Sequence, residues 1–287
     1  MQPADNINIS LSRFFRRTSF SELAKGGDLK HLISNINVDI FKGKDITFRE
    51  FFEILFDSLR ENYRNEYVYK SAIVNKIVFG RHSPRTSSSA IELPVNNSIV
   101  DVAVFNGYST AYEIKTEYDT PKRLATQAFD YLDVFDKVYI VTHQSCAEKY
   151  AQLNIPCLGV LSLNSRDGLS LIKEAEENTN NIKLDKLFNI LRRKEYVSII
   201  ENYTSKKIEM PNGIINSYCR DIYLKMPLDI ARNYFISAMK KRTADRDFID
   251  FIYSLPTCLR ALGYATPLSK KQKDYVVNLM DSKVGFL

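Results

Sequence analysis

Apolar and polar residues alternate with a helical period in the first part of the chain. A capping box at residues 47–50 is followed by apolar side chains at every third or fourth position, which predicts a helix that packs on a core. A second helix is predicted over residues 66–79, ending at Gly80. At about 100° per residue, Glu66 and Ile73 share nearly one angular position. We therefore expect the Glu66 carboxylate on or beside the buried stripe.

After a polar loop, the period shortens to two residues, which is typical of β-strands. Three short β-rich runs, at 90–95, 99–105 and 110–115, are separated by turns that contain asparagine. Turns of this length join neighbouring antiparallel strands. The pattern therefore predicts an antiparallel meander of three strands.

A helix, a covered strand and a hairpin are predicted after the meander. The helix spans 120–134, with a threonine as N-cap and Pro121 as the first helical residue. The apolar run 137–142 is typical of a strand that is covered on both faces. Strands at 157–163 and 169–172 are joined by a polar turn that contains glycine, which predicts a hairpin.

Strand patterns stop near residue 181, and amphipathic helices replace them. The chain is therefore predicted to have an α/β domain followed by an all-helical C-terminal domain. We expect a helical extension at 1–46, the α/β core at 47–180 and a basic helical domain at 181–287, with the last boundary near 178–181. The expected C-terminal helices span 183–203, 214–225, 228–242, 245–255 and 270–280.

The composition is that of an ordinary globular protein. Of 287 residues, 45% are hydrophobic and 26% are charged, which excludes the disordered and coiled-coil classes. The sequence has no apolar run near the ~18 residues of a membrane span, and its first residues do not form a basic-then-apolar leader. The four cysteines lack a C-x-x-C pair, so we expect reduced thiols. We therefore expect a cytoplasmic protein that does not contact a membrane.

The net charge of +6 is unevenly distributed along the chain. Residues 181–287 hold 19 Lys and Arg against 11 Asp and Glu, whereas residues 1–180 hold 21 against 23. A basic part of this kind suits a polyanion such as nucleic acid, although solvated helices also carry many cations. The expected nucleic-acid contacts in this part are Lys240, Lys241 and Arg242.

A single aspartate interrupts the apolar strand 99–105. Aspartate is depleted in strands and is costly to bury, so Asp101 needs a partner there. On the next predicted strand, Glu113 and Lys115 share one face. A three-residue turn at 106–108 would place Asp101 directly opposite Glu113, whereas a five-residue turn would place it opposite Lys115.

Either register brings two carboxylates and a lysine together. Neighbouring carboxylates repel each other unless a cation lies between them, and Mg²⁺ prefers such oxygen ligands. Each residue also has an ordinary interpretation. Asp101 can accept a backbone N–H, Glu66 can pair with Lys70 one turn later, and the Glu-x-Lys motif can lie on a solvated strand face. Their occurrence together in one helix and meander favours a metal site.

The spacing of Asp101, Glu113 and Lys115 after a helical glutamate resembles the PD-(D/E)XK nuclease superfamily. Over about residues 66–175, the chain is similar to the sce7726 family of predicted bacterial nucleases. Val100 stands where the superfamily has the proline of its name. The resemblance implies a restriction-endonuclease-like core of order α-β-β-β-α-β, with a mixed sheet flanked by helices. The residues that carry the closer resemblance are 99–107 and 112–116 with Asp119, Arg123, Leu124, Gln127, Tyr131, Phe135 and Asp136.

The resemblance also implies a metal site. Asp101 and Glu113 would bind Mg²⁺, for which Mn²⁺ can substitute, and the carbonyl of Ile114 would be a further ligand. Lys115 would orient or help to deprotonate the attacking water and would stabilise the charge that develops on the phosphate.

Accessory residues are implied in the same way. Glu66 on the core helix would supply another metal-binding carboxylate, and Glu92 at the first strand is the alternative. Gln127 is an expected catalytic residue, while Arg123 and Tyr131 on the same helix would face the scissile phosphate. A solvated helix face is the alternative interpretation of this polar stripe.

The expected function is hydrolysis of phosphodiester bonds by a magnesium-dependent nuclease, with DNA as the expected substrate. The resemblance further suggests phage defence or a mobile element, with either a homo-oligomer or a separate defence-system partner. The first alternative is a nucleic-acid-binding or protein-interaction module that keeps the fold without turnover. The second is a helical adaptor. Retained Asp101, Glu113 and Lys115 disfavour both alternatives, because an unused site does not need costly buried charge.

Overall fold

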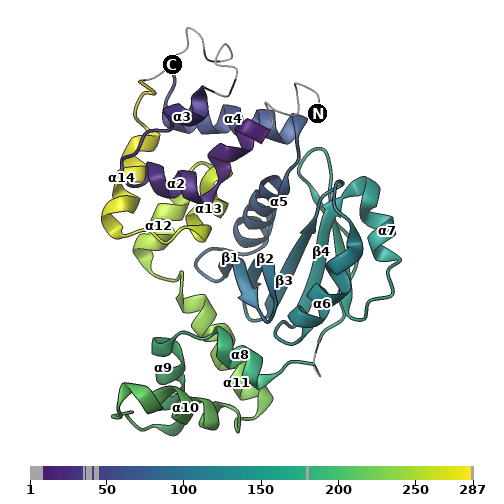
Figure 1. Ribbon diagram of the computed structural model, residues 1–287, viewed down its shortest axis with the longest axis vertical. Helices are drawn as coiled ribbons and strands as arrows, with labels where there is room; N and C mark the ends of the chain where they lie inside the picture. Colours follow the sequence, from purple (N-terminus) through teal and green to yellow (C-terminus); the bar gives the residue numbers. More distant parts are fainter. Residues whose placement is uncertain (1–8, 35, 37–40, 42–44, 179–180, 286–287) are drawn as a thin grey trace. The chain divides into compact units, whose positions relative to one another are not determined.

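The computed structural model describes two compact units, each assembled from separate stretches of the chain (Figure 1). This grouping differs from the three consecutive domains that the sequence predicts, because the first helices join the last ones. Residues 179 and 180, at the expected boundary, lie outside the described residues. The described residues are 9–34, 36, 41, 45–178 and 181–285. Unit 1 takes its residues from 1–81, 165–169 and 245–287, and unit 2 from 82–164 and 170–244.

Pairing between early and late residues explains why unit 1 contains both. Thr47 forms an isolated antiparallel bridge with Lys283. Beside it, the backbone N–H of Phe48 donates to the carbonyl of Ser282 at 3.0 Å. The start of the first long helix is thus hydrogen-bonded to a segment from the other end of the sequence.

Helix α4 (Phe48–Asn62) begins with the predicted capping box. The backbone N–H of Glu50 donates to Oγ1 of Thr47 at 3.3 Å, and the backbone N–H of Thr47 donates to Oε2 of Glu50 at 2.8 Å. The apolar stripe of α4 is buried, and the ring of Phe51 meets that of Phe14 edge to face at 5.7 Å between centroids. The prediction of a core-packing helix is therefore confirmed.

Helix α5 (Glu66–Ile73) continues as a π-helix, η3 (Val74–Arg81). The predicted helix is present, but its predicted end at Gly80 is wrong. Gly80 does not have the positive φ that a helix-ending glycine adopts, and the wider turn carries the chain past it.

The other helices of unit 1 come from both ends of the chain. Asp245 and Ser269 cap the two predicted helices near the C-terminus, which are confirmed, whereas α13 is not predicted by the sequence pattern. The bounds are η1 (Arg13–Phe15), α2 (Arg17–Leu23), α3 (Lys30–Ile33), α12 (Arg246–Ser254), η6 (Thr257–Leu259), α13 (Arg260–Ala265) and α14 (Lys270–Met280).

The described residues form one mixed sheet of six strands in sequential order. The first three strands are antiparallel, as the meander predicts, and the next two strands add in parallel. The strands are β1 (Ser88–Val95), β2 (Ser98–Phe105), β3 (Ser109–Lys115), β4 (Lys137–His143), β5 (Leu158–Leu163) and β6 (Leu169–Lys173). The mixed α/β class that the sequence predicts is therefore confirmed.

Helices connect the parallel strands of unit 2 and cover the sheet (Figure 1). A 3-10 turn, η4 (Pro121–Arg123), leads into α6 (Leu124–Leu132), which packs against β2 and β4. The predicted helix is thus present with a tighter first turn. After the short turn η5 (Gln144–Cys146), α7 (Ala147–Ala151) packs against β4 and β5.

Four further helices complete unit 2, and one predicted helix is replaced by two of them. The expected helix over 183–203 breaks at Leu191 and Arg192, whose backbones are extended. The break is stabilised because Oε2 of Glu195 accepts the backbone N–H of Arg192 at 2.7 Å and so caps a new helix. The four are α8 (Leu184–Ile190), α9 (Arg193–Thr204), α10 (Asn212–Tyr223) and α11 (Leu228–Lys241).

Helix α11 packs on the sheet and shares its core. Phe235 of α11 meets Phe105 of β2 at 6.0 Å between ring centroids, and Phe135 meets Phe105 at 6.2 Å. Among the helices of the described residues, none combines the length and the apolar character needed to cross a bilayer. All four cysteines are free thiols, and Cys219 and Cys258 are buried.

An ion pair ties the end of α11 to the start of α9. Arg242 donates from Nε and Nη2 to the two carboxylate oxygens of Glu195, each at 2.7 Å. Burial raises the pKa of Glu195, but the hydrogen bonds from Arg242 and from the Arg192 amide outweigh burial and hold the pKa below its ordinary value of 4.5. A carboxylate with a lowered native pKa stabilises the folded state above its unfolded pKa and loses this effect as the pH falls through the native value.

We therefore expect Glu195→Gln to lower the free energy of unfolding by about 1–3 kcal/mol at neutral pH, as the loss of a charged hydrogen-bond partner does. The difference from the unaltered protein should shrink as the pH falls below about 4.5. Urea unfolding at several pH values measures this directly. A stability difference that stays constant down to pH about 3 would contradict the assignment.

Candidate active site

The turn between β2 and β3 fixes which residues face each other. Phe105 pairs with Ser109, so the turn between them has three residues. The ladder of paired residues ends at Val102 and Tyr112. One further step along the same register places Asp101 opposite Glu113. The structure thus selects the first of the two registers that the sequence leaves open.

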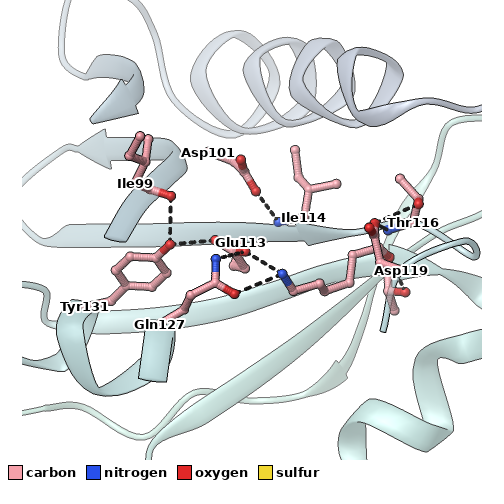
Figure 2. A network of polar contacts seen from close by, with 10 residues as sticks. Ile99, Asp101, Glu113, Ile114, Thr116, Asp119, Gln127 and Tyr131 are labelled. Atoms are coloured by element: carbon pink, nitrogen blue, oxygen red, sulfur yellow. Dashed lines mark hydrogen bonds and ion pairs between the residues drawn. The ribbon is translucent and has the colours of Figure 1, made fainter. Parts of the chain in front are cut away.

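Asp101 lies one residue beyond the last backbone-paired residue of the β2–β3 ladder, and its side chain connects the two strands there (Figure 2). Its Oδ2 accepts the backbone N–H of Ile114 at 2.7 Å. The interpretation of Asp101 as an acceptor of a backbone N–H is therefore confirmed, with the donor on the neighbouring strand and not at a bulge. The half-buried carboxylate is fixed beside β3 by this bond.

Glu113 is the buried centre of the network in Figure 2, with 3% of its surface exposed. Its Oε1 accepts from Nζ of Lys115 at 2.7 Å and from Nε2 of Gln127 at 2.6 Å. Its Oε2 accepts from the hydroxyl of Tyr131 at 2.7 Å. Three residues from β3 and α6 thus hold one carboxylate in place.

Lys115 bridges the strand and the helix. Its Nζ also donates to Oε1 of Gln127 at 3.0 Å, and only 12% of its side chain is exposed. Gln127 therefore accepts from the lysine and donates to Glu113 with the two ends of one amide. The predicted catalytic residues Glu113, Lys115 and Gln127 are brought into mutual contact.

Tyr131 supports Glu113 from within the core and is not exposed to a substrate. The side chain is fully buried, and its hydroxyl lies 2.8 Å from the carbonyl of Ile99 as well as 2.7 Å from Glu113. Burial and the charge of Glu113 raise the pKa of Tyr131, so the hydroxyl stays protonated. A hydroxyl has one hydrogen, so Tyr131 donates to one of these two acceptors at a time. The expected phosphate contact by Tyr131 does not fit its burial.

A short loop after β3 is fixed by Asp119. Its Oδ2 accepts from the backbone N–H of Thr116 at 2.8 Å and from its hydroxyl at 2.7 Å. Figure 2 shows this contact beside the carboxylate network, at the end of the strand that carries Lys115. Arg123, another expected substrate contact, is exposed on η4.

The two candidate accessory carboxylates lie in different units. Glu66 belongs to unit 1, where its side chain is 53% exposed and pairs with Lys70 at 2.5 Å. The expectation was a position on or beside the buried stripe, and the exposed Glu66 side chain lies beside it, paired with the buried Lys70. Glu66 is the first residue of α5, directly after the N-cap Asn65, where the side chain reaches solvent.

Glu92 lies in the same unit as Asp101 and Glu113. On either side of it, Ile91 pairs with Val102 and Leu93 with Val100, so the β1–β2 register places Glu92 opposite Asp101. Glu92 has φ of 55°, which interrupts the ladder at this step. The register therefore aligns three carboxylates in one row across β1, β2 and β3.

Asp136 of unit 2 is a carboxylate with 1% of its surface exposed, and its sequence pattern predicted no role for it. Its Oδ2 accepts from the backbone N–H of Ser109 at 2.6 Å, and its Oδ1 accepts from Arg232 of α11. These contacts connect the first residues of β3 with α11. The position of Asp136 directly before a buried strand was the available signal.

Asp101 and Glu113 supply the carboxylate oxygens of this site, and oxygen ligands are the kind that a hard divalent cation prefers. Over the described residues, no three Asp, Glu, His or Cys side chains come together as a group that could hold a metal. Oε1 of Glu113 has two donors, but Oε2 has only the Tyr131 hydroxyl, which has a second acceptor in Ile99. Turning that hydrogen toward Ile99 would free a lone pair of Oε2 for a cation. Asp101 and Glu113 would then supply two ligands, and water or phosphate the others.

Comparison with known proteins assigns a family to most of the chain. A family model described as Bacteriophage P4 protein cII matches residues 59–260. The comparison with curated proteins gave no match, and neither did the comparison with solved structures. The matched range contains all six strands and the helices from α5 to α12, and it includes the whole carboxylate network.

Proposed function

This chain belongs to the bacteriophage P4 protein cII family, and we propose that it is a metal-dependent nuclease that hydrolyses phosphodiester bonds, with DNA as its substrate. The observation that carries the proposal is the convergence of two carboxylates and a lysine of β2 and β3 with a glutamine of α6. Glu113 lies 2.7 Å from Lys115 and 2.6 Å from Gln127, and the register places Asp101 opposite it.

The resemblance to the PD-(D/E)XK superfamily and to the sce7726 family supports the proposal. A restriction-endonuclease-like core is proposed on the same basis, because an antiparallel meander followed by a helix and a parallel strand agrees with the implied order. The phage protein in the family's name agrees with a role in phage defence or in a mobile element.

Mg²⁺ or Mn²⁺, when bound at Asp101 and Glu113, would polarise the phosphate and acidify a water molecule. The protein's own side chains would prepare that site. Lys115 keeps its ammonium beside Glu113, where it can hold the attacking water and balance charge that develops on the phosphate. Gln127 accepts from Nζ of Lys115 at 3.0 Å and so fixes the lysine, and the buried Tyr131 fixes the carboxylate of Glu113. Such preorganisation lowers the reorganisation needed during reaction.

A binding module without turnover is the second candidate function, and one observation favours it. Both oxygens of Glu113 already accept hydrogen bonds from protein donors, so the network is satisfied without a cation. A buried carboxylate with three donors is also a stable structural element. Metal binding and cleavage are therefore the properties that distinguish the two candidates.

The purified protein should be incubated with supercoiled plasmid, linear duplex DNA, single-stranded DNA and RNA, each with Mg²⁺, Mn²⁺ or EDTA. We expect cleavage of DNA with either metal, no cleavage in EDTA, and recovery when excess metal is restored, because ligand carboxylates alone do not activate water. A calorimetric titration with each metal should be run in parallel. Absence of both metal binding and cleavage would refute the nuclease and favour the binding module.

A further inference from the structure

A basic groove lies between α9 and α11, within unit 2. Its volume is about 880 Å³, which is ample for several groups of a ligand. Its charged lining consists of Arg192, Arg193, Lys194, Lys241 and Arg242 with one carboxylate, Glu195.

Folding assembles this groove from two separate runs of cations. Residues 192–194 and 240–242 are each three consecutive Lys or Arg residues, and they lie far apart in the sequence. The first run begins α9 and the second ends α11. Five of the six cations line the groove, and Lys240 is the exception. The expected contact surface at Lys240, Lys241 and Arg242 is therefore only half of a larger basic site.

The charge of the groove is not balanced by its own carboxylate. Glu195 is occupied by Arg242, with both carboxylate oxygens bound at 2.7 Å. Arg193 contacts the neutral side chain of Asn212. Over the described part of the chain, Arg192, Arg193, Lys194 and Lys241 form no ion pair, and all four are exposed. Four like charges around one concavity repel each other and attract a polyanion.

We propose that the basic groove binds the phosphate backbone of a nucleic-acid strand. The hydroxyl groups of Ser198 and Ser237 line the groove among the cations and can donate to phosphate or sugar oxygens. The amide of Asn202 also lines the groove and donates to the carbonyl of Ser198. Tyr234 adds a half-buried aromatic ring, a group on which bases stack. A concave site suits a strand that enters it, whereas a flat anionic membrane is better contacted by a protruding surface.

The proposal assigns different roles to the cations of the second run. Arg242 is a structural residue that braces the groove through Glu195, while Lys241 faces the ligand. Whether a strand bound in the groove is then cleaved rests on the proposed function. Binding itself is independent of cleavage, because a module without turnover would use the same groove.

The test uses the full chain in EDTA, where the proposed cleavage is switched off. The groove variant combines Arg193→Gln, Lys194→Gln and Lys241→Gln. The control variant combines Lys206→Gln, Lys207→Gln and Lys225→Gln, which removes the same charge from exposed positions of unit 2 outside the groove. Thermal unfolding of both variants checks that the fold is kept.

Binding is measured by fluorescence anisotropy with a labelled single-stranded DNA, its duplex and the matching RNA over a range of salt concentrations. Loss of three phosphate contacts should weaken binding of a single strand about 10- to 100-fold and flatten the slope of log K against log salt by about 2. The control variant should bind nearly as the unaltered protein does. The three probes show which strand type the groove accepts.

Four outcomes decide the proposal. Equal binding by the groove and control variants would overturn it, because net charge and not the groove would then carry the affinity. Sedimentation with phosphatidylserine vesicles but no binding of any nucleic acid would also overturn it. Groove-dependent binding without cleavage in either metal would support the groove and refute the nuclease, whereas cleavage with groove-independent binding would do the reverse.

Discussion

Asp101→Asn is expected to lower metal-dependent cleavage by at least about 10³-fold while the protein stays folded. The amide oxygen of asparagine can still accept the N–H of Ile114, which Asp101 accepts at 2.7 Å, so the end of the β2–β3 pair is preserved. The negative charge that would bind the cation is lost. Cleavage of labelled DNA and a calorimetric Mg²⁺ titration measure the two effects separately.

Glu117→Gln is the matched control, because Glu117 is an exposed carboxylate two residues after Lys115 and is not among the hydrogen-bond partners of Glu113. This variant should cleave normally. Glu113→Gln should also be inactive, but it places an amide among three donors and is expected to unfold at a lower temperature. Normal cleavage by Asp101→Asn would remove the assignment of this carboxylate as a metal ligand.

Lys115→Arg and Lys115→Ala are both expected to lose about 10²–10³-fold in turnover, as when one preorganised stabiliser of a transition state is removed. The ammonium lies between Glu113 at 2.7 Å and Gln127 at 3.0 Å, a space that a wide planar guanidinium does not match. Metal binding should survive in both variants, since both carboxylates remain. Single-turnover cleavage with saturating metal isolates the chemical step.

Lys122→Arg and Lys122→Ala provide the comparison, because Lys122 is an exposed lysine on η4. Both should retain activity. Turnover by Lys115→Arg within a few-fold of normal would show that any cation suffices beside Glu113. Lys115 would then be a charge partner only, and another group would have to position the water.

The sheet and its central carboxylates were accessible from the sequence, because both depend on local patterns. Alternation of two residues located β1 to β3, and the count of residues in the turn restricted Asp101 to two registers. The polar stripe that includes Gln127 was visible in the spacing of the helix after β3, whereas the contact of Gln127 with Lys115 was not predicted. Such features need only chain geometry over a few residues.

Other parts of the site depend on packing that spacing does not encode. Tyr131 shares the stripe of Gln127 but lies fully inside the core, because its ring fills space between α6 and the strands. Glu66 matched the angular position of a buried residue, yet at the first turn of α5 it reaches solvent. Angular position alone does not show how deeply the end of a helix is covered.

The basic groove shows the same limit at longer range. Each run of cations could be read from the sequence, but their meeting depends on the break at Leu191 and Arg192. A single helix over 183–203 would have continued through the break and directed the first run elsewhere. Glu195 caps α9 through a contact with a residue three positions earlier, and this cap allows cations that are far apart in the sequence to meet in the groove.

Because Thr47 pairs with Lys283, unit 1 cannot be completed until residues 245–287 have been synthesised. All residues of unit 2 are synthesised before residues 245–287. Until then, α4 lacks its late partners, and apolar rings such as Phe51 belong to an unfinished core. Nascent chains with such surfaces depend on chaperones. Termination of the chain after residue 244 would therefore damage its earliest helices.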